Sequence, residues 1–209
     1  MPILEADIAL TDFFLFAITL ILGLKLQKRK NLRKPRERWV FLLLFYTVSL
    51  SSLAGGIAHG FYSNAPESTI FKILWLIIFV NVGFATYSMT HVAAKNLNNM
   101  KLLWLLSVFL MPFFIYALLG GNNFLYCAFI ALFGQIIFLF TSIYEFRRGN
   151  LAWKAALLGC LATCLGMIVQ VVHIGFENFG PSAIFHIIQA AGMLYYFSFA
   201  KQYLGQYST

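Results

Sequence analysis

Three histidines and two carboxylates are the residues of this sequence whose types could support chemistry together. His59, His173 and His186 stand near the ends of long apolar segments, and Asp12 and Glu177 lie near the same ends. Imidazole nitrogen and carboxylate oxygen are ligands of Zn²⁺, and a catalytic zinc ion has three protein ligands and a water in the fourth position. The ion lowers the pKa of that water to about 7. We therefore interpret the three histidines as metal ligands, and Glu177 or Asp12 as the general base.

The composition indicates what kind of structure must position these residues. The chain has 209 residues, of which 61% are hydrophobic and 11% charged, and its mean hydropathy is +0.80. A soluble domain has about 25% charged residues, so the sequence indicates an integral membrane protein with one domain, residues 1–209. The cysteines lie in apolar runs and fit packing positions better than disulfides. They are Cys127, Cys160 and Cys164.

Seven apolar segments are each long enough to cross a bilayer as a helix, which needs about 20 residues. Helices are favoured over strands because the apolar runs are long and do not alternate. Short polar connectors, such as "SNAPES" and "RRGN", separate the segments. The sequence therefore predicts an all-α bundle of seven transmembrane helices, with spans near residues 8–26, 38–62, 68–92, 101–119, 123–146, 152–175 and 182–204.

The basic residues predict the orientation of the bundle. Fourteen of the 15 Lys and Arg residues fall on one side of a seven-helix layout, and Lys72 falls on the other. Basic loops remain in the cytoplasm, so we expect the N-terminus outside and the C-terminus inside, in the inner (plasma) membrane of a bacterium. The connector "QKRKNLRKPRER" carries much of this charge. We attribute the net charge of +8 to topology and to contact with anionic lipid headgroups, not to nucleic acid.

The predicted topology places the three candidate ligands at one depth. His59 and His173 lie near the outer ends of their helices, and His186 lies about one turn below the outer surface. Ionisable groups within spans are costly and usually face the bundle interior, so the three rings could converge on one point. Glu177 follows His173 by four residues and shares its face if the helix continues that far. His91 is expected on the cytoplasmic side.

Neighbouring residues favour a site at this depth. Gly55 and Gly56 form a smooth stripe one turn before His59. Gln170 and Gln189 are each three residues from a histidine and could orient its ring. In the alternative interpretation, each histidine is only a polar helix end and the glycines allow close packing of two helices.

Two motifs carry a resemblance to a known family. "GGIAHGF" and "IFHIIQAAGMLYYF", with Thr11–Asp12 opening the first span, resemble a bacterial branch related to the CREST superfamily. That superfamily includes alkaline ceramidases and the progestin and adipoQ receptors, so the resemblance implies a seven-helix fold and zinc-dependent amide hydrolysis. His59 and His186 match its pattern. Gly55 stands where the family has a serine, and His173 would be a replacement ligand.

The sequence leaves two functions open. The first is a zinc-dependent hydrolase that acts on a lipid, or on an amphiphilic amide or ester, at the outer leaflet. The second is a non-catalytic seven-helix protein that binds a lipid, a small ligand or haem, with His59 and either His173 or His186 as axial ligands. Membrane lipids and an amphiphilic substrate are the expected partners, nucleic acid is not, and the oligomeric state is left open.

Overall fold

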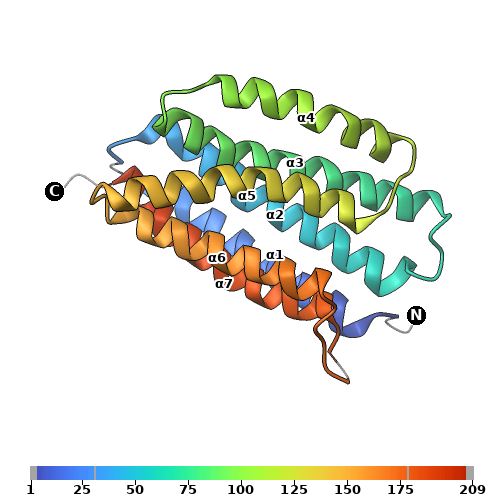
Figure 1. The fold of residues 1–209 in the computed structure, drawn as a ribbon. Helices are drawn as coiled ribbons and strands as arrows, with labels where there is room; N and C mark the ends of the chain where they lie inside the picture. The colour runs from blue at the N-terminus through green and yellow to red at the C-terminus, as the bar shows by residue number, and fades with distance from the viewer. Residues whose placement is uncertain (1–3, 31, 178, 206–209) are drawn as a thin grey trace.

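Seven long α-helices make up the computed structural model, which describes residues 4–30, 32–177 and 179–205 (Figure 1). All seven are long and apolar enough to cross a membrane, which confirms the predicted all-α bundle and its seven spans. The chain is therefore an integral membrane protein. The helices are α1 (Ala6–Gln27), α2 (Arg38–Ile57), α3 (Thr69–Asn96), α4 (Lys101–Leu118), α5 (Phe124–Arg147), α6 (Ala152–Val171) and α7 (Pro181–Leu204). Two short elements flank α2, a 3₁₀ turn η1 (Pro35–Glu37) and a π-helix η2 (Ala58–Tyr62).

Six of the helices form a closed ring, which we name the six-helix ring. Each helix packs against the next in the order α1, α2, α3, α5, α6 and α7, and α7 packs against α1. Helix α4 lies outside the ring, beside α3, at the top of Figure 1. It contacts α5 through aromatic side chains. Phe109 stacks on Phe133 with ring centroids 4.4 Å apart, and the centroids of Tyr116 and Tyr126 are 4.3 Å apart. The six-helix ring therefore encloses the interior without α4.

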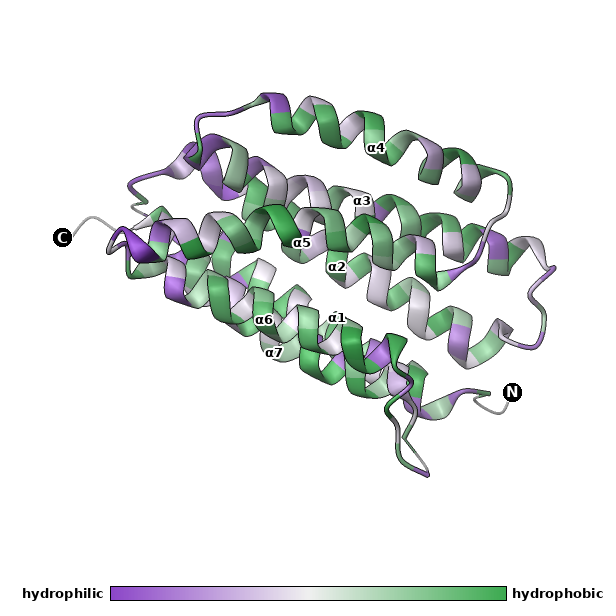
Figure 2. Cartoon of the chain, viewed as in Figure 1, coloured by the Kyte–Doolittle hydropathy of each residue, from purple (hydrophilic) through white to green (hydrophobic). Residues whose placement is uncertain are grey.

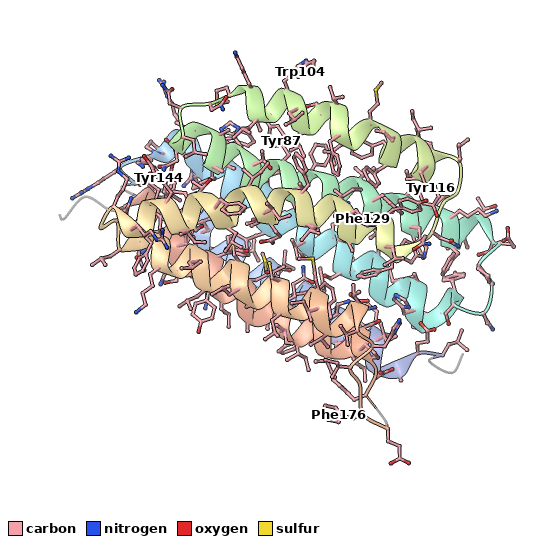
Figure 3. All side chains as sticks on the ribbon, in the orientation of Figure 1. Tyr87, Trp104, Tyr116, Phe129, Tyr144 and Phe176 are labelled. Atoms are coloured by element: carbon pink, nitrogen blue, oxygen red, sulfur yellow. The ribbon has the colours of Figure 1, made fainter. Side chains whose placement is uncertain are left out.

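Hydrophobic residues occur along the length of the helices in Figure 2, and many large apolar side chains are exposed. Trp104, Leu118 and Phe140 are 71%, 71% and 67% exposed, and Trp104 points away from the bundle in Figure 3. Large contiguous apolar surfaces are rare on soluble monomers. In a transmembrane bundle these side chains face the lipid, and their exposure fits the composition of the chain.

The two ends of the bundle differ in charge. Helices α1, α3, α5 and α7 begin at one end, which we name the N-terminal end of the bundle. Fourteen of the 15 Lys and Arg residues lie in or near the connectors at the opposite end, where hydrophilic residues gather on the left of Figure 2. Lys72 is the exception, and its Nζ lies 2.9 Å from the carboxylate of Glu67.

Helix α6 ends at Val171, four residues before the predicted boundary at 175. His173 has a φ of 58°, in the left-handed region. Its backbone N–H donates to the carbonyl of Gln170 at 3.4 Å, and that of Ile174 donates to Val169 at 3.0 Å. These two bonds form a Schellman motif, which terminates a helix by satisfying its last carbonyls. The position usually holds glycine, so hydrophobicity alone did not mark this end.

Candidate functional site

A cavity of about 150 Å³ lies inside the six-helix ring. All six ring helices and η2 contribute to its wall, and none of the described residues of α4 does. The cavity extends from residues near the N-terminal end of the bundle, such as Phe124, to the deeper residues Gln135 and Tyr196. The polar lining residues toward the N-terminal end of the bundle include Asp12, His59, Trp75 and His186.

Three of these lining residues lie at a similar depth on three different helices. Asp12 is six residues after the start of α1, Trp75 is six after the start of α3, and His186 is five after the start of α7. With a helical rise of about 1.5 Å per residue, this places them about 7.5 to 9 Å below the helix starts. His59 lies in η2, closer to the N-terminal end of the bundle.

Asp12 and His186 form a pair where α1 contacts α7. Oδ1 of Asp12 lies 3.4 Å from Nε2 of His186, and the two side chains are 6% and 12% exposed. The other ring nitrogen of His186, Nδ1, lies 3.2 Å from Oγ1 of Thr11. The Thr11 hydroxyl is also within 2.9 and 3.0 Å of the carbonyls of Asp7 and Ile8. If the Thr11 hydroxyl donates its one proton to a carbonyl, its oxygen can only accept a bond from His186. Nδ1 of His186 then carries a proton and donates it to Thr11. The lone pair of Nε2 then faces a carboxylate oxygen, and this arrangement needs a shared proton or another donor.

Gly55 provides the space that the Asp12 carboxylate occupies. A Cβ added at Gly55 would lie 2.8 Å from Oδ2 of Asp12, which is closer than two such atoms can pack. Oδ1 of the carboxylate therefore faces His186, while Oδ2 packs against the backbone of α2. The glycine predicted from the sequence as part of a smooth stripe thus accommodates a charged group of the neighbouring helix.

His59 contacts the residues that directly precede α1. Its Nδ1 lies 2.5 Å from Oε2 of Glu5, and the two side chains are 27% and 42% exposed. The backbone N–H of Glu5 donates to the carbonyl of His59 at 3.3 Å, and that of Leu4 donates to Gly60 at 3.0 Å. Because Glu5 occupies Nδ1, Nε2 is the ring atom of His59 that is available to a ligand. A single π-helical turn such as η2 is frequent at functional sites.

The deep end of the cavity has satisfied polar groups. The hydroxyl of Tyr196 donates to Oε1 of Gln135 at 2.9 Å, and Nε2 of Gln135 donates to Sδ of Met89 at 3.4 Å. Asn81 also lines the cavity, and its side chain donates to the carbonyl of Ile77 at 2.7 Å. Tyr196, Gln135 and Asn81 therefore already have hydrogen-bond partners within the protein.

His173 and Glu177 do not line the cavity. Both are exposed in the loop that follows α6, and the end of α6 at Val171 removes the shared helical face predicted for them. Phe176, which lies between them in sequence, projects away from the bundle in Figure 3. The predicted site residues that the structure places around one cavity are Asp12, His59 and His186.

The described residues do not fit a three-ligand zinc site. Within residues 4–30, 32–177 and 179–205, no three His, Cys, Asp or Glu side chains are grouped closely enough to hold a metal ion. His173 lies in the loop, and His91 packs between Trp39 and Tyr87, with ring centroids 5.3 and 5.8 Å away. We therefore derive no catalytic step that depends on Zn²⁺.

The sequence analysis did not identify two residues of this site. Glu5 is separated from His59 by 54 positions, and a single acidic residue before the first span has no pattern that predicts its partner. Trp75 is 7% exposed and lines the cavity, and its Nε1 has no hydrogen-bond partner among the described residues. Tryptophans of membrane proteins are enriched at the ends of spans. The position of Trp75 inside a span was therefore the signal that could have identified it as a residue of the site.

The fold and the cavity define a class, the seven-helix membrane proteins, here with six helices arranged around an internal cavity. The chain belongs to the family of unknown function DUF6962, whose model matches residues 8–204. The match extends from α1 to the end of α7 and so covers the whole ring. Comparison with curated proteins and with solved structures finds no match for the chain.

Proposed function

We propose that this protein binds a small amphiphilic molecule in the cavity of the six-helix ring. The observation that carries the proposal is the arrangement of the wall, in which Asp12, His59 and His186 line one cavity among mostly apolar residues. Ligand sites of proteins are concave, largely apolar and furnished with a few convergent polar groups. The cavity has each of these properties.

The size of the cavity restricts the ligand. A cavity of about 150 Å³ in another protein holds a molecule the size of benzene, and this cavity has the same volume. One aromatic ring or a short aliphatic chain fits this space. A haem macrocycle, with four five-membered rings, does not, so the cavity favours a small ligand over the haem considered from the sequence.

Filling the cavity tests the proposal. Ala131 lines the cavity from α5, whereas Ala17 is exposed on α1, so Ala131→Leu removes cavity volume and Ala17→Leu adds the same atoms on the outer surface. Benzyl alcohol should raise the melting temperature of the wild type and of Ala17→Leu, but not that of Ala131→Leu. At about ten times its Kd, a ligand stabilises the folded state by about 1.4 kcal/mol. Equal stabilisation of all three proteins would refute a ligand site in the ring.

We also propose an orientation for the bundle. The N-terminal end of the bundle would face the outside and the basic end the cytoplasm of a bacterium, because Lys and Arg residues remain on the cytoplasmic side of a membrane. The support is the position of 14 of the 15 basic residues at one end. The cavity would then be nearest to the outer leaflet.

Zinc-dependent hydrolysis, implied by the resemblance to the CREST superfamily, is a second candidate. One observation favours it. Partners occupy Nδ1 of both His59 and His186, which leaves Nε2 of each ring available, as in many metal-binding histidines. Asp12 lines the same cavity. Analysis of the metal content tests this candidate, and the variants for it are described below.

A further inference from the structure

We propose that the ligand of the cavity carries a protonated amine that pairs with the carboxylate of Asp12. This inference rests on the proposed function and specifies its substrate class. It follows from the surroundings of Asp12, from the aromatic side chains of the same cavity and from the indole N–H of Trp75.

Among the described residues, no Lys or Arg pairs with the Asp12 carboxylate. Asp12 is 4% exposed, and no Lys or Arg lines the cavity among the described residues. Its nearest ionisable neighbour is Nε2 of His186 at 3.4 Å, beyond the ordinary range of about 2.7 to 3.2 Å for an N–H···O bond. No described residue donates a hydrogen bond to the carboxylate within that range. Burial of a charge is costly unless it is paired and hydrogen-bonded, so the site is suited to an external donor.

An amine fits this position better than a single proton donor. In the tautomer in which Nδ1–H of His186 donates to Thr11, both Nε2 of His186 and Oδ1 of Asp12 are acceptors. An ammonium group has three N–H donors and can donate to both atoms at once. The positive charge of the amine also offsets the negative charge of the buried carboxylate, and charge-assisted hydrogen bonds are the stronger ones.

Aromatic side chains also line the cavity. Phe124 and Phe185 form an edge-to-face pair with ring centroids 6.1 Å apart, and both line the cavity with Trp75. Faces of aromatic rings attract cations, and this attraction is larger in sites that exclude water. A cavity lined by aromatic rings and one carboxylate is therefore suited to an organic cation.

Trp75 indicates a second polar atom in the ligand. Its Nε1 is buried and has no acceptor among the described residues, and Trp75 lies at the depth of Asp12 and His186. A buried donor without a partner is costly, and a ligand oxygen that reaches Nε1 after an adjustment of the side chains would accept this bond. An amine with a neighbouring hydroxyl or ether oxygen, attached to one ring or a short chain, satisfies the carboxylate, the histidine and the indole together.

Two ligands of nearly equal size, one charged and one neutral, show how much the charge of the ligand contributes to its affinity. Benzylamine is protonated at neutral pH and benzyl alcohol is not, so their affinities can be compared by calorimetry on the purified full-length protein. The Ala131→Leu variant, whose cavity is filled, gives the background that arises from partition of each ligand into the detergent. We expect benzylamine to bind the wild type at least about tenfold more tightly, since a hydrogen bond to a charged group contributes about 1.5 to 3 kcal/mol.

The matched variants are Asp12→Asn and Asp7→Asn, both in α1. Asp7 accepts a hydrogen bond from the backbone N–H of Gly180 at 2.7 Å and does not line the cavity. Asp12→Asn should abolish the preference for benzylamine while benzyl alcohol still binds, and Asp7→Asn should retain the preference.

Three results would overturn the inference. Equal affinity of the two ligands in the wild type refutes the amine but not the ligand site. If Asp12→Asn still prefers benzylamine to benzyl alcohol, the amine does not pair with Asp12. That result is expected if His186 is the partner of the Asp12 carboxylate. Binding of neither ligand above the Ala131→Leu background refutes the proposed function and the amine together. The wild-type ratio decides the first case even if Asp12→Asn fails to fold.

Discussion

Gly55 of α2 and Asp12 of α1 are complementary in shape. Oδ2 of Asp12 lies only 2.8 Å from the position that a Cβ at Gly55 would occupy. The glycine allows the two helices to pack closely and holds the carboxylate at the wall of the cavity. Its neighbour Gly56 has a similar relation to Phe13, whose ring would lie 2.8 Å from a Cβ. Only the first pair lines the cavity through both members.

Gly55→Ala should weaken ligand binding more than it affects folding. The new methyl group would displace the Asp12 carboxylate, whereas alanine is the better helix former by about 1 kcal/mol. We expect the affinity for benzylamine to fall about fivefold, which corresponds to about 1 kcal/mol, with little loss of melting temperature. Calorimetry and thermal unfolding measure the two effects.

Gly56→Ala is the matched control, because it forces a similar adjustment on Phe13 without touching the carboxylate. Its affinity for benzylamine should equal that of the wild type. If both alanine variants lose affinity equally, the effect comes from separation of α1 and α2, and the specific relation between Gly55 and Asp12 is refuted.

His173→Gly should leave the protein as stable as the wild type or raise its stability by up to about 1 kcal/mol. His173 has a φ of 58°, and glycine adopts this conformation without the cost that a side chain imposes. His173→Ala should be the less stable of the two variants. Thermal unfolding provides the comparison, and a large loss of stability in His173→Gly would indicate a role beyond the end of α6.

The metal content of the purified protein tests the zinc prediction. His173→Gly and His91→Ala should hold the same amount of metal as the wild type, because neither residue lines the cavity. His59→Ala and His186→Ala are the variants that should lower any zinc content, which elemental analysis measures. Loss of zinc in His173→Gly would restore the three-histidine site predicted from the sequence. Wild-type protein purified without chelator and free of metal would refute zinc-dependent hydrolysis.

A pair of reporter fusions tests the orientation. A reporter fused after Thr209 should be active on the cytoplasmic side, and one fused to the N-terminus should be active outside, because an odd number of spans separates the termini. Neutralising substitutions in the basic connector between α1 and α2 should reduce this preference. Both termini reporting on the same side would contradict the count of seven spans.

The sequence predicted the helices closely because lipid-facing helices are uniformly apolar. The second span was predicted to end at 62, and the structure reaches Tyr62 through α2 and η2. Periodicity does not distinguish the π-helical turn from the α-helix before it. The end of α6 was missed because His173 occupies a left-handed position without a glycine or proline to mark it.

The site was predictable where polar residues of an unusual type stand in apolar spans. Asp12, His59 and His186 stand out in apolar spans, and the structure places them around one cavity. Their partners were not predictable, since the contact of Glu5 with His59 depends on how α1 meets η2. The exclusion of α4 from the ring depends likewise on packing between distant segments, and all seven spans look alike in composition.

The most direct test of the account is a crystal structure of the wild-type protein grown with 4-bromobenzylamine. The anomalous signal of bromine identifies the position of the ligand independently of how its electron density is interpreted. The account predicts a bromine peak inside the six-helix ring, with the amine beside Oδ1 of Asp12, and no such peak in crystals of Ala131→Leu. Bromine peaks confined to the lipid-facing surface, with the ring interior free of ligand in the wild type, would contradict it.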